Sequence, residues 1–212
     1  MAKRSTIGVG LVGALVAAAL IFHAAPAGAQ TIIDQWSSVK VPPPPELKKV
    51  KADPQTMAFL VLDLINPICS TKPTCVATLP KVAKFLDAAR AHKMPVIYSE
   101  VPGRTEKDIL PQVAPKPGEP IVSFRADKFI NTDLEKLLKD RKISTVIVVG
   151  TAAQGAVLYT SSHAAFLGLK VIVPVDGMSS DPFGELATAW TLANAPGVGA
   201  ATTLTRFDMI DW

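Results

Sequence analysis

The chain has 212 residues, of which 49% are hydrophobic and 19% are charged. This length gives room for one domain with a sizeable core, and the composition excludes a disordered chain. The formal net charge is +4, and it falls to +2 when Lys3 and Arg4 are set aside with the N-terminal segment described next. Because no cluster of Lys and Arg with interleaved aromatic residues occurs, we expect no nucleic-acid partner.

Residues 1–29 have the layout of a secretory signal peptide. A basic start precedes an apolar run from Ile7 to Phe22, and the small residues Ala-Gly-Ala end the segment. An uncleaved membrane anchor is the alternative, but the apolar run is short and rich in Gly and Ala. We therefore expect cleavage after Ala29, a periplasmic or secreted protein, and no membrane association after cleavage.

Two cysteines, Cys69 and Cys75, lie in the polar stretch "CSTKPTC". In an oxidising compartment two nearby cysteines more often form a disulfide than remain free thiols, so we expect a disulfide. Two cysteines without a nearby His or further Cys cannot complete a tetrahedral zinc shell, and we expect no metal site.

Strands and helices alternate along the rest of the chain. Residues 30–55 are a leader with four consecutive prolines, which favour an extended polyproline segment. Apolar runs and helical spacing predict the elements that follow. The expected strands are 56–64, 94–100, 144–150 and 170–177, with a weaker one at 199–210, and the expected helices are 76–93, 131–142, 154–169 and 181–195. This order predicts one domain over residues 56–212, a three-layer α/β/α sandwich with a mostly parallel, Rossmann-like sheet.

Several aromatic residues lie on the two later helices. Tyr159, Phe166 and Trp190 are expected to belong to the core. A lone His163 on an Ala-rich helix is more often a packing or interface residue than a catalyst.

Acidic residues stand where predicted strands end, which is the edge at which open α/β sheets bind ligands. Asp63 stands out because the run before it contains no other polar group. It is expected to face a ligand, with capping of a neighbouring helix as the alternative. Glu100 is a weaker candidate acid, and the long loop 101–120, with five prolines, is of a kind that often covers a site.

The order of these pieces resembles the isochorismatase-like (cysteine) hydrolase superfamily. "FLVLDLIN" at 59–66 is similar to the opening strand of that family, and "FINTDL" at 129–134 to a helix start. The most specific likeness is the strand, turn and helix within "VIVVGTAAQGAVLYTSSHAAFLGLKVIVPVDGMSS" at 146–180. The resemblance covers roughly residues 56–180. It implies a hydrolase acting without a cofactor on a small, anionic molecule, and a homo-oligomer.

The resemblance also implies a set of catalytic positions, namely an Asp, a Lys and a nucleophilic Cys. Asp63 occupies the Asp position, whereas the Cys position falls on Ala156 and the Lys position on Ser123. Alanine has no lone pair with which to attack, so thioester chemistry at this position is excluded. Arg125 or Lys128 could supply the missing cation, or either could be a solvated surface charge.

True isochorismatases resemble this chain in carrying a small residue at the Cys position. In that branch the strand-end Asp acts as general acid in the hydrolysis of a vinyl ether, and burial of Asp63 would favour that role by raising its pKa. Backbone N–H groups of the turn would hold negative charge. The expected substrate-binding residues are Asn66, Ala152, Ala153, Gln154 and Gly155. Two alternatives stay open: a catalytically inactive binding or interaction protein of the same fold, and a thiol hydrolase that uses a reduced Cys69.

Overall fold

The computed structural model describes residues 31–212 and divides into two units, of which the second begins at Pro42. The described part of the first unit, 31–41, holds a short helix, α1 (Ile32–Gln35), followed by a 3-10 turn. The expected signal peptide, residues 1–29, lies outside the described residues. Within residues 31–212, no helix has the length and apolar character needed to cross a membrane.

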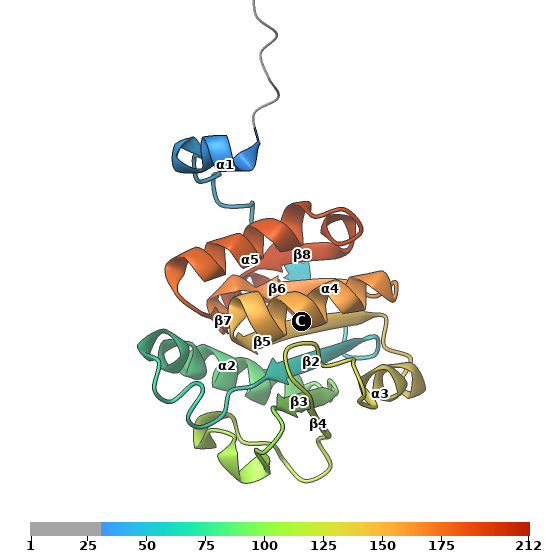
Figure 1. Ribbon diagram of the computed structural model, residues 1–212. Coiled ribbons are helices and arrows are strands. Elements are labelled where there is room, and N and C mark those ends of the chain that lie inside the picture. Colours follow the sequence, from blue (N-terminus) through green and yellow to red (C-terminus); the bar gives the residue numbers. More distant parts are fainter. Residues whose placement is uncertain (1–30) are drawn as a thin grey trace, which may run out of the picture. The chain divides into compact units, whose positions relative to one another are not determined.

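The second unit is built on a seven-stranded sheet (Figure 1). Its strands are β2 (Met57–Leu62), β3 (Val96–Glu100), β4 (Ile121–Ser123), β5 (Thr145–Thr151), β6 (Lys170–Pro174), β7 (Met178–Ser179) and β8 (Thr202–Thr205). The order along the sheet is β4-β3-β2-β5-β6-β8, every neighbouring pair is parallel, and β7 extends the pairing of β5. A separate parallel pair joins β1 (Val50–Lys51) to β9 (Ile210–Asp211).

Helices cover both faces of this sheet, which confirms the predicted three-layer α/β/α sandwich (Figure 1). Helix α2 (Pro73–Ala91) packs on one face, in one apolar cluster with Phe59 and Val61. The other face carries α3 (Leu134–Asp140), α4 (Leu158–Phe166) and α5 (Pro182–Asn194). Leu60 and Leu62 belong to the cluster on that second face. Strand β2 thus needs an unbroken apolar run because both of its faces are buried.

The aromatic residues of α4 and α5 lie at the surface. Tyr159 is 53% exposed, Phe166 69% and Trp190 43%, so the prediction that they belong to the core is wrong. The buried face of α4 consists instead of small residues, namely Thr160, Ser161, Ala164 and Ala165. Small side chains let the helix backbone approach the sheet closely, which leaves its large side chains outside.

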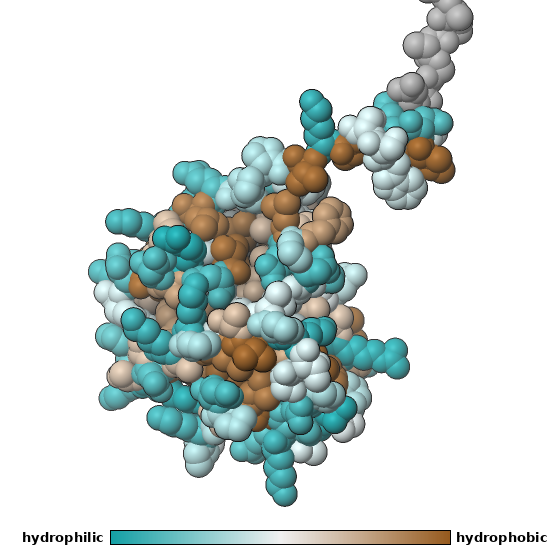
Figure 2. All heavy atoms as spheres, turned by 90° about the vertical axis from the view of Figure 1, so that its left-hand side faces the viewer, coloured by the Kyte–Doolittle hydropathy of each residue, from teal (hydrophilic) through white to brown (hydrophobic). Residues whose placement is uncertain are grey.

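The strand order changes direction between β2 and β5. From β2 the order runs through β3 to β4 on one side, and from β5 it runs through β6 to β8 on the other. Open α/β sheets bind ligands beyond the carboxyl ends of their strands at such a point. Gly150 pairs in register with Leu62. Its φ is +132° and an added Cβ would lie 1.9 Å from the carbonyl oxygen of Leu62, so only glycine fits. Figure 2 looks onto the carboxyl edge, where hydrophobic groups lie among hydrophilic ones.

Candidate active site

Asp63 is the first residue after β2 and lies at the point where the strand order changes. Its φ is +53°, a left-handed conformation that is uncommon for any residue with a side chain. The residue is only 4% exposed. Oδ1 of its carboxyl group accepts a hydrogen bond of 2.8 Å from the hydroxyl of Ser99, on the neighbouring β3. The end of the strand therefore holds this carboxyl group in one orientation, away from bulk water.

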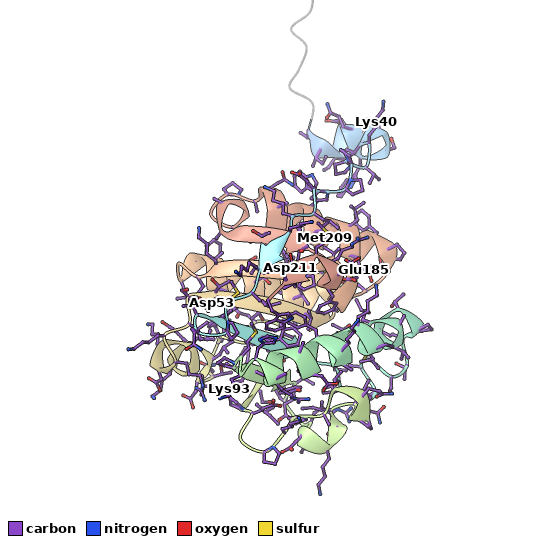
Figure 3. All side chains as sticks on the ribbon, turned by 180° about the vertical axis from the view of Figure 1, so that it is seen from behind. Lys40, Asp53, Lys93, Glu185, Met209 and Asp211 are labelled. Carbon is purple, nitrogen blue, oxygen red and sulfur yellow. A yellow bond between two sulfur atoms is a disulfide. The ribbon has the colours of Figure 1, made fainter. Side chains whose placement is uncertain are left out.

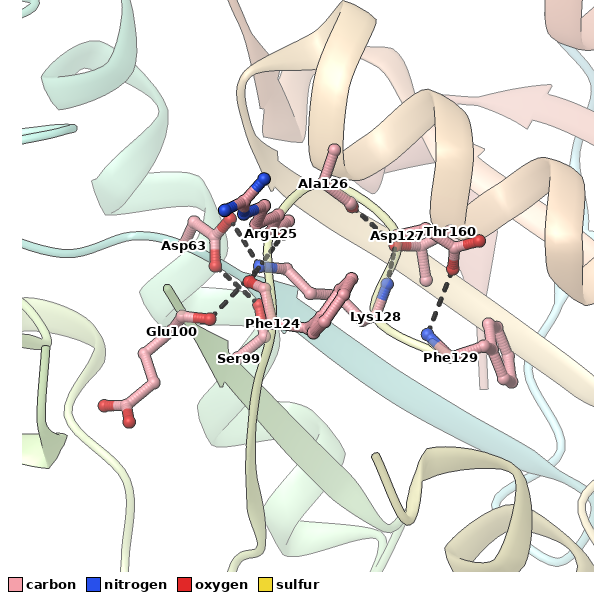
Figure 4. A network of polar contacts seen from close by, with 10 residues as sticks. All are labelled: Asp63, Ser99, Glu100, Phe124, Arg125, Ala126, Asp127, Lys128, Phe129 and Thr160. Carbon is pink, nitrogen blue, oxygen red and sulfur yellow. Dashed lines mark hydrogen bonds and ion pairs between the residues drawn. The ribbon is translucent and has the colours of Figure 1, made fainter. Parts of the chain in front are cut away.

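Lys128 is the cation that meets this carboxyl group. The side chain of Lys128 is fully buried, and its Nζ lies 2.8 Å from Oδ2 of Asp63 (Figure 4). The same Nζ donates to the backbone carbonyl oxygens of Glu100 at 3.1 Å, Phe124 at 2.7 Å and Arg125 at 2.6 Å. Four oxygen atoms thus surround one ammonium group, and this compensates for the loss of its hydration.

Burial acts on the pKa values of both members of the pair. It raises the pKa of Asp63, although the charge of Lys128 and the hydrogen bonds from Lys128 and Ser99 oppose the change. It lowers the pKa of Lys128, again against the opposing effect of Asp63. Each shift favours the uncharged form of its group. The two opposed groups lie 2.8 Å apart.

Helix α4 holds the segment that carries Lys128. The hydroxyl of Thr160, which is fully buried, accepts a hydrogen bond of 3.2 Å from the backbone N–H of Lys128. Nδ1 of His163 lies 2.7 Å from Oδ2 of Asp127. The ring of His163 also contacts Phe129, with centroids 4.8 Å apart. Residues 127–129 are therefore fixed from a helix more than thirty positions later in the sequence.

Other residues predicted for the site occupy different places. Ser123 ends β4 with its side chain exposed. Arg125 is also exposed, and only its backbone carbonyl contacts Lys128. Asn66 is exposed, and its side-chain oxygen accepts a hydrogen bond from Ser70. The structure thus brings together Asp63 and Lys128, and it does not join the side chains of the other three to the pair.

The turn after β5 supplies backbone groups rather than reactive side chains. After a cis peptide bond between Thr151 and Ala152, residues Ala153–Val157 form one π-helical turn that leads into α4. The N–H of Gly155 donates to the carbonyl of Ala152. The N–H groups of Ala153 and Gln154 donate to no acceptor among residues 31–212. Gln154 is exposed, so its N–H group at a helix start is open to a negatively charged oxygen, whereas Ala153 is fully buried.

Ala156, at the position that the resemblance gives to the nucleophilic cysteine, is 3% exposed. Its methyl group belongs to the apolar cluster that also contains Leu62 and Met178. The position therefore lies in a turn that contacts β5, β7 and α5, and it offers no polar atom of its side chain.

Glu100 ends β3 next to the buried pair. Burial raises the pKa of its carboxyl group, and the negative charges of Asp108 and Asp63 add to this. One carboxyl oxygen, Oε2, is buried and has no hydrogen-bond partner among residues 31–212. The loop 101–120 lies close by, because the carbonyl of Asp108 accepts from the N–H of Asn66 at 2.7 Å. The loop therefore borders the segment that follows Asp63.

The predicted disulfide between Cys69 and Cys75 is confirmed, with a sulfur–sulfur distance of 2.05 Å. Both cysteines are fully buried, and the described residues contain no free cysteine. The alternative of a thiol hydrolase that uses reduced Cys69 is therefore wrong. Within the same residues, no group of three His, Cys, Asp or Glu side chains is arranged to hold a metal ion.

Three residues that help to form the site were not predicted from the sequence, namely Ser99, Thr160 and Asp127. Ser99 stands beside the strand-end Glu100, so the rule that ligand-binding groups collect at strand ends could have included it. Thr160 and Asp127 could not have been found this way, because their roles come from contacts between a loop and a distant helix.

Comparison with known proteins places this geometry in a family. A model described as the isochorismatase domain matches residues 57–205, a range that contains Asp63, Lys128 and Ala156. N-carbamoylsarcosine amidase from Arthrobacter sp. is 29% identical over 130 residues. That match covers 48% of this chain and 49% of the amidase, so the chain spans about half the length of this relative.

Solved structures show the same fold. An isochorismatase family protein from Burkholderia thailandensis superposes with a TM-score of 0.65 at 20% identity, covering 77% of this chain and 97% of that one. N-carbamoylsarcosine amidase from Thermoplasma acidophilum gives a TM-score of 0.63 at 22% identity, covering 72% of this chain and 97% of its own.

Proposed function

The chain belongs to the isochorismatase family of hydrolases, and on this premise we propose that it hydrolyses a small anionic molecule with Asp63 as general acid and no thiol nucleophile. The observation that carries the proposal is the buried pair of Asp63 and Lys128, 2.8 Å apart at the strand-order switch. A buried carboxylate needs a compensating cation. In a proton donor, that cation also stabilises the carboxylate that remains after transfer.

A vinyl ether is the substrate class that suits this site. The protonated carboxyl group of Asp63 would deliver its proton to the enol carbon, which leaves an oxocarbenium ion. Water then adds to that ion and returns a proton to the carboxylate, and the resulting hemiketal collapses to a ketone and an alcohol. No side chain needs to attack, so Ala156 suffices at the turn. The N–H group of Gln154 and the exposed guanidinium of Arg125 would hold an anionic group of the substrate.

We further propose that the mature protein begins at Gln30, acts in the periplasm or outside the cell, and works without a cofactor. The buried disulfide supports export, because disulfides persist in oxidising compartments. The exposed aromatic residues Tyr159, Phe166 and Trp190 support a homo-oligomer, since large apolar side chains on adjacent helices commonly mark subunit contacts.

One observation favours a second candidate, a binding protein of the same fold without catalysis. Ala153 and Ala156 are buried in the apolar cluster beneath the turn. If these side chains close the turn to ligands, the pair of Asp63 and Lys128 would serve only to stabilise the fold.

A substrate screen with matched variants separates the two functions. Amides, esters and vinyl ethers are offered to the mature protein, to Asp63→Asn and to Asp87→Asn, which removes an exposed carboxylate from α2. We expect turnover of a vinyl ether that Asp63→Asn abolishes, that Asp87→Asn retains and that iodoacetamide leaves unchanged. Turnover that survives Asp63→Asn contradicts the general acid, and ligand binding without turnover supports the binding protein.

A further inference from the structure

A hollow lies on the α2 side of the molecule, and neither Asp63 nor Lys128 lines it. It has a volume of about 430 Å³, within the range of small-molecule sites. Its walls come from α2 and from the segment after β8, which runs through a 3-10 turn (Phe207–Met209) into β9. Figure 3 shows α2 from this side, with Met209 and Asp211 labelled on the second wall.

The carboxylate of Asp176 contacts both walls of the hollow. Oδ2 of Asp176 lies 3.0 Å from Nζ of Lys81 on α2, and Oδ1 accepts a hydrogen bond of 3.1 Å from the backbone N–H of Phe207. Asp176 thus ties the turn after β8 to the helix.

Aromatic rings form the floor. The ring centroid of Phe85 lies 5.1 Å from that of Phe207 and 5.3 Å from that of Trp212, with which it is stacked. Trp212 stacks in turn on His92, with centroids 4.4 Å apart. Phe207 and Trp212 are half-buried and line the hollow. Such a floor favours a flat ring as ligand.

One lysine on the rim has no partner among the described residues. The charged side chains that line the hollow are Lys81, Lys84 and Arg206, with the two carboxylates Asp176 and Asp208. Lys81 and Arg206 each pair with one of these carboxylates. Lys84 is exposed and makes no hydrogen bond or ion pair with any residue from 31 to 212. One cation is therefore left for an anion bound above the rings.

From this arrangement we propose that the hollow binds a small aromatic carboxylate. The ring lies against Phe207 and Trp212, and the carboxylate is held by Lys84. The site does not depend on the proposed hydrolysis, because it shares no residue with the pair of Asp63 and Lys128.

Binding is measured through Trp212 fluorescence. The protein has three tryptophans, and Trp36→Phe with Trp190→Phe leaves Trp212 as the only reporter. The probes are benzoate, benzyl alcohol as the ring without charge, and acetate as the charge without ring. We expect saturable quenching by benzoate alone, and calorimetry on the unaltered protein gives the same affinity without any variant.

The charge contact is tested by Lys84→Gln, with Lys116→Gln as an exposed lysine outside the hollow. We expect Lys84→Gln to weaken benzoate binding about fivefold, less than a buried charged contact would because the rim is wet. Lys116→Gln should leave the affinity unchanged. The proposal is overturned by benzoate that does not saturate, by equal effects of benzyl alcohol or acetate, or by equal weakening in both lysine variants.

Discussion

His163 on α4 lies 2.7 Å from Asp127, the residue directly before the buried Lys128. A helix that follows β5 thereby sets the position of a loop that follows β4. We expect His163→Ala to release residues 127–129 while the rest of the fold stays intact. The loss of one partly exposed contact should cost about 1 kcal/mol of unfolding free energy. Hydrogen exchange at the backbone N–H groups of Lys128 and Phe129 measures the local effect.

The matched control is Ser162→Ala, next to His163 on the same helix and partly exposed. It should change neither the exchange rates nor the stability beyond about 0.5 kcal/mol. Exchange at Lys128 that is equally slow in His163→Ala and the unaltered protein would show that Thr160 alone holds the loop.

The two members of the buried pair should differ in their effect on stability. Lys128→Met removes the partner of Asp63 and also leaves three carbonyl oxygens without their donor, so we expect a loss of about 3–5 kcal/mol. Asp63→Asn leaves those three bonds in place, and its amide oxygen accepts from Ser99 or Lys128. We expect a smaller loss of about 1–3 kcal/mol. Urea denaturation measures the free energy of unfolding of both variants. A larger loss in Asp63→Asn than in Lys128→Met would show that the ion pair contributes more to stability than the carbonyl contacts do.

The pH dependence of stability reports the state of Asp63. Burial raises its pKa above the ordinary value of 3.8, so the folded state binds this proton more readily than the unfolded state. The contribution of Asp63 to stability is then fully present below the ordinary value and is lost as pH rises through the raised pKa. The stability advantage of the unaltered protein over Asp63→Asn should therefore shrink as pH rises above about 4. An advantage that grows over this range would mean that Lys128 holds the pKa below its ordinary value.

The sequence pattern predicted the layers of the fold because burial itself produces the pattern. Strands β2 and β5 read as unbroken apolar runs, and Asp63 stood out against the first of them. Strand β4 was not predicted, since its three residues lie between proline-rich loops. The pairing of β1 with β9 was also missed, because two-residue strands about 160 positions apart leave no periodic signal.

For the site, the sequence identified the acid but left Lys128 as one of two possible cations. Nothing local distinguishes Lys128 from Arg125. The difference arises because Thr160 and His163 fix the backbone of 127–129. The conformation of such a loop is decided by tertiary contacts, which no local pattern records.

Ala156→Cys tests whether the site would activate a thiol at the position where the chain carries alanine. Cys69 and Cys75 are the only cysteines in the chain and are joined to each other, so the introduced sulfur would be the single free thiol. If its position faces Lys128, the cation should lower the thiol pKa below about 8.5 and accelerate alkylation at neutral pH. The pH profile of iodoacetamide labelling, followed by mass spectrometry, measures this pKa.

Gln154→Cys supplies the comparison, because it places a thiol on an exposed residue of the same turn. We expect the labelling of this thiol to be unaffected by Lys128→Met. Labelling of Ala156→Cys should slow when Lys128→Met is added, since the cation that favours the thiolate is gone. A thiol at position 156 that resists labelling while that at 154 reacts would show that the apolar cluster closes the turn against ligands, and the binding protein would then be the better account of this fold.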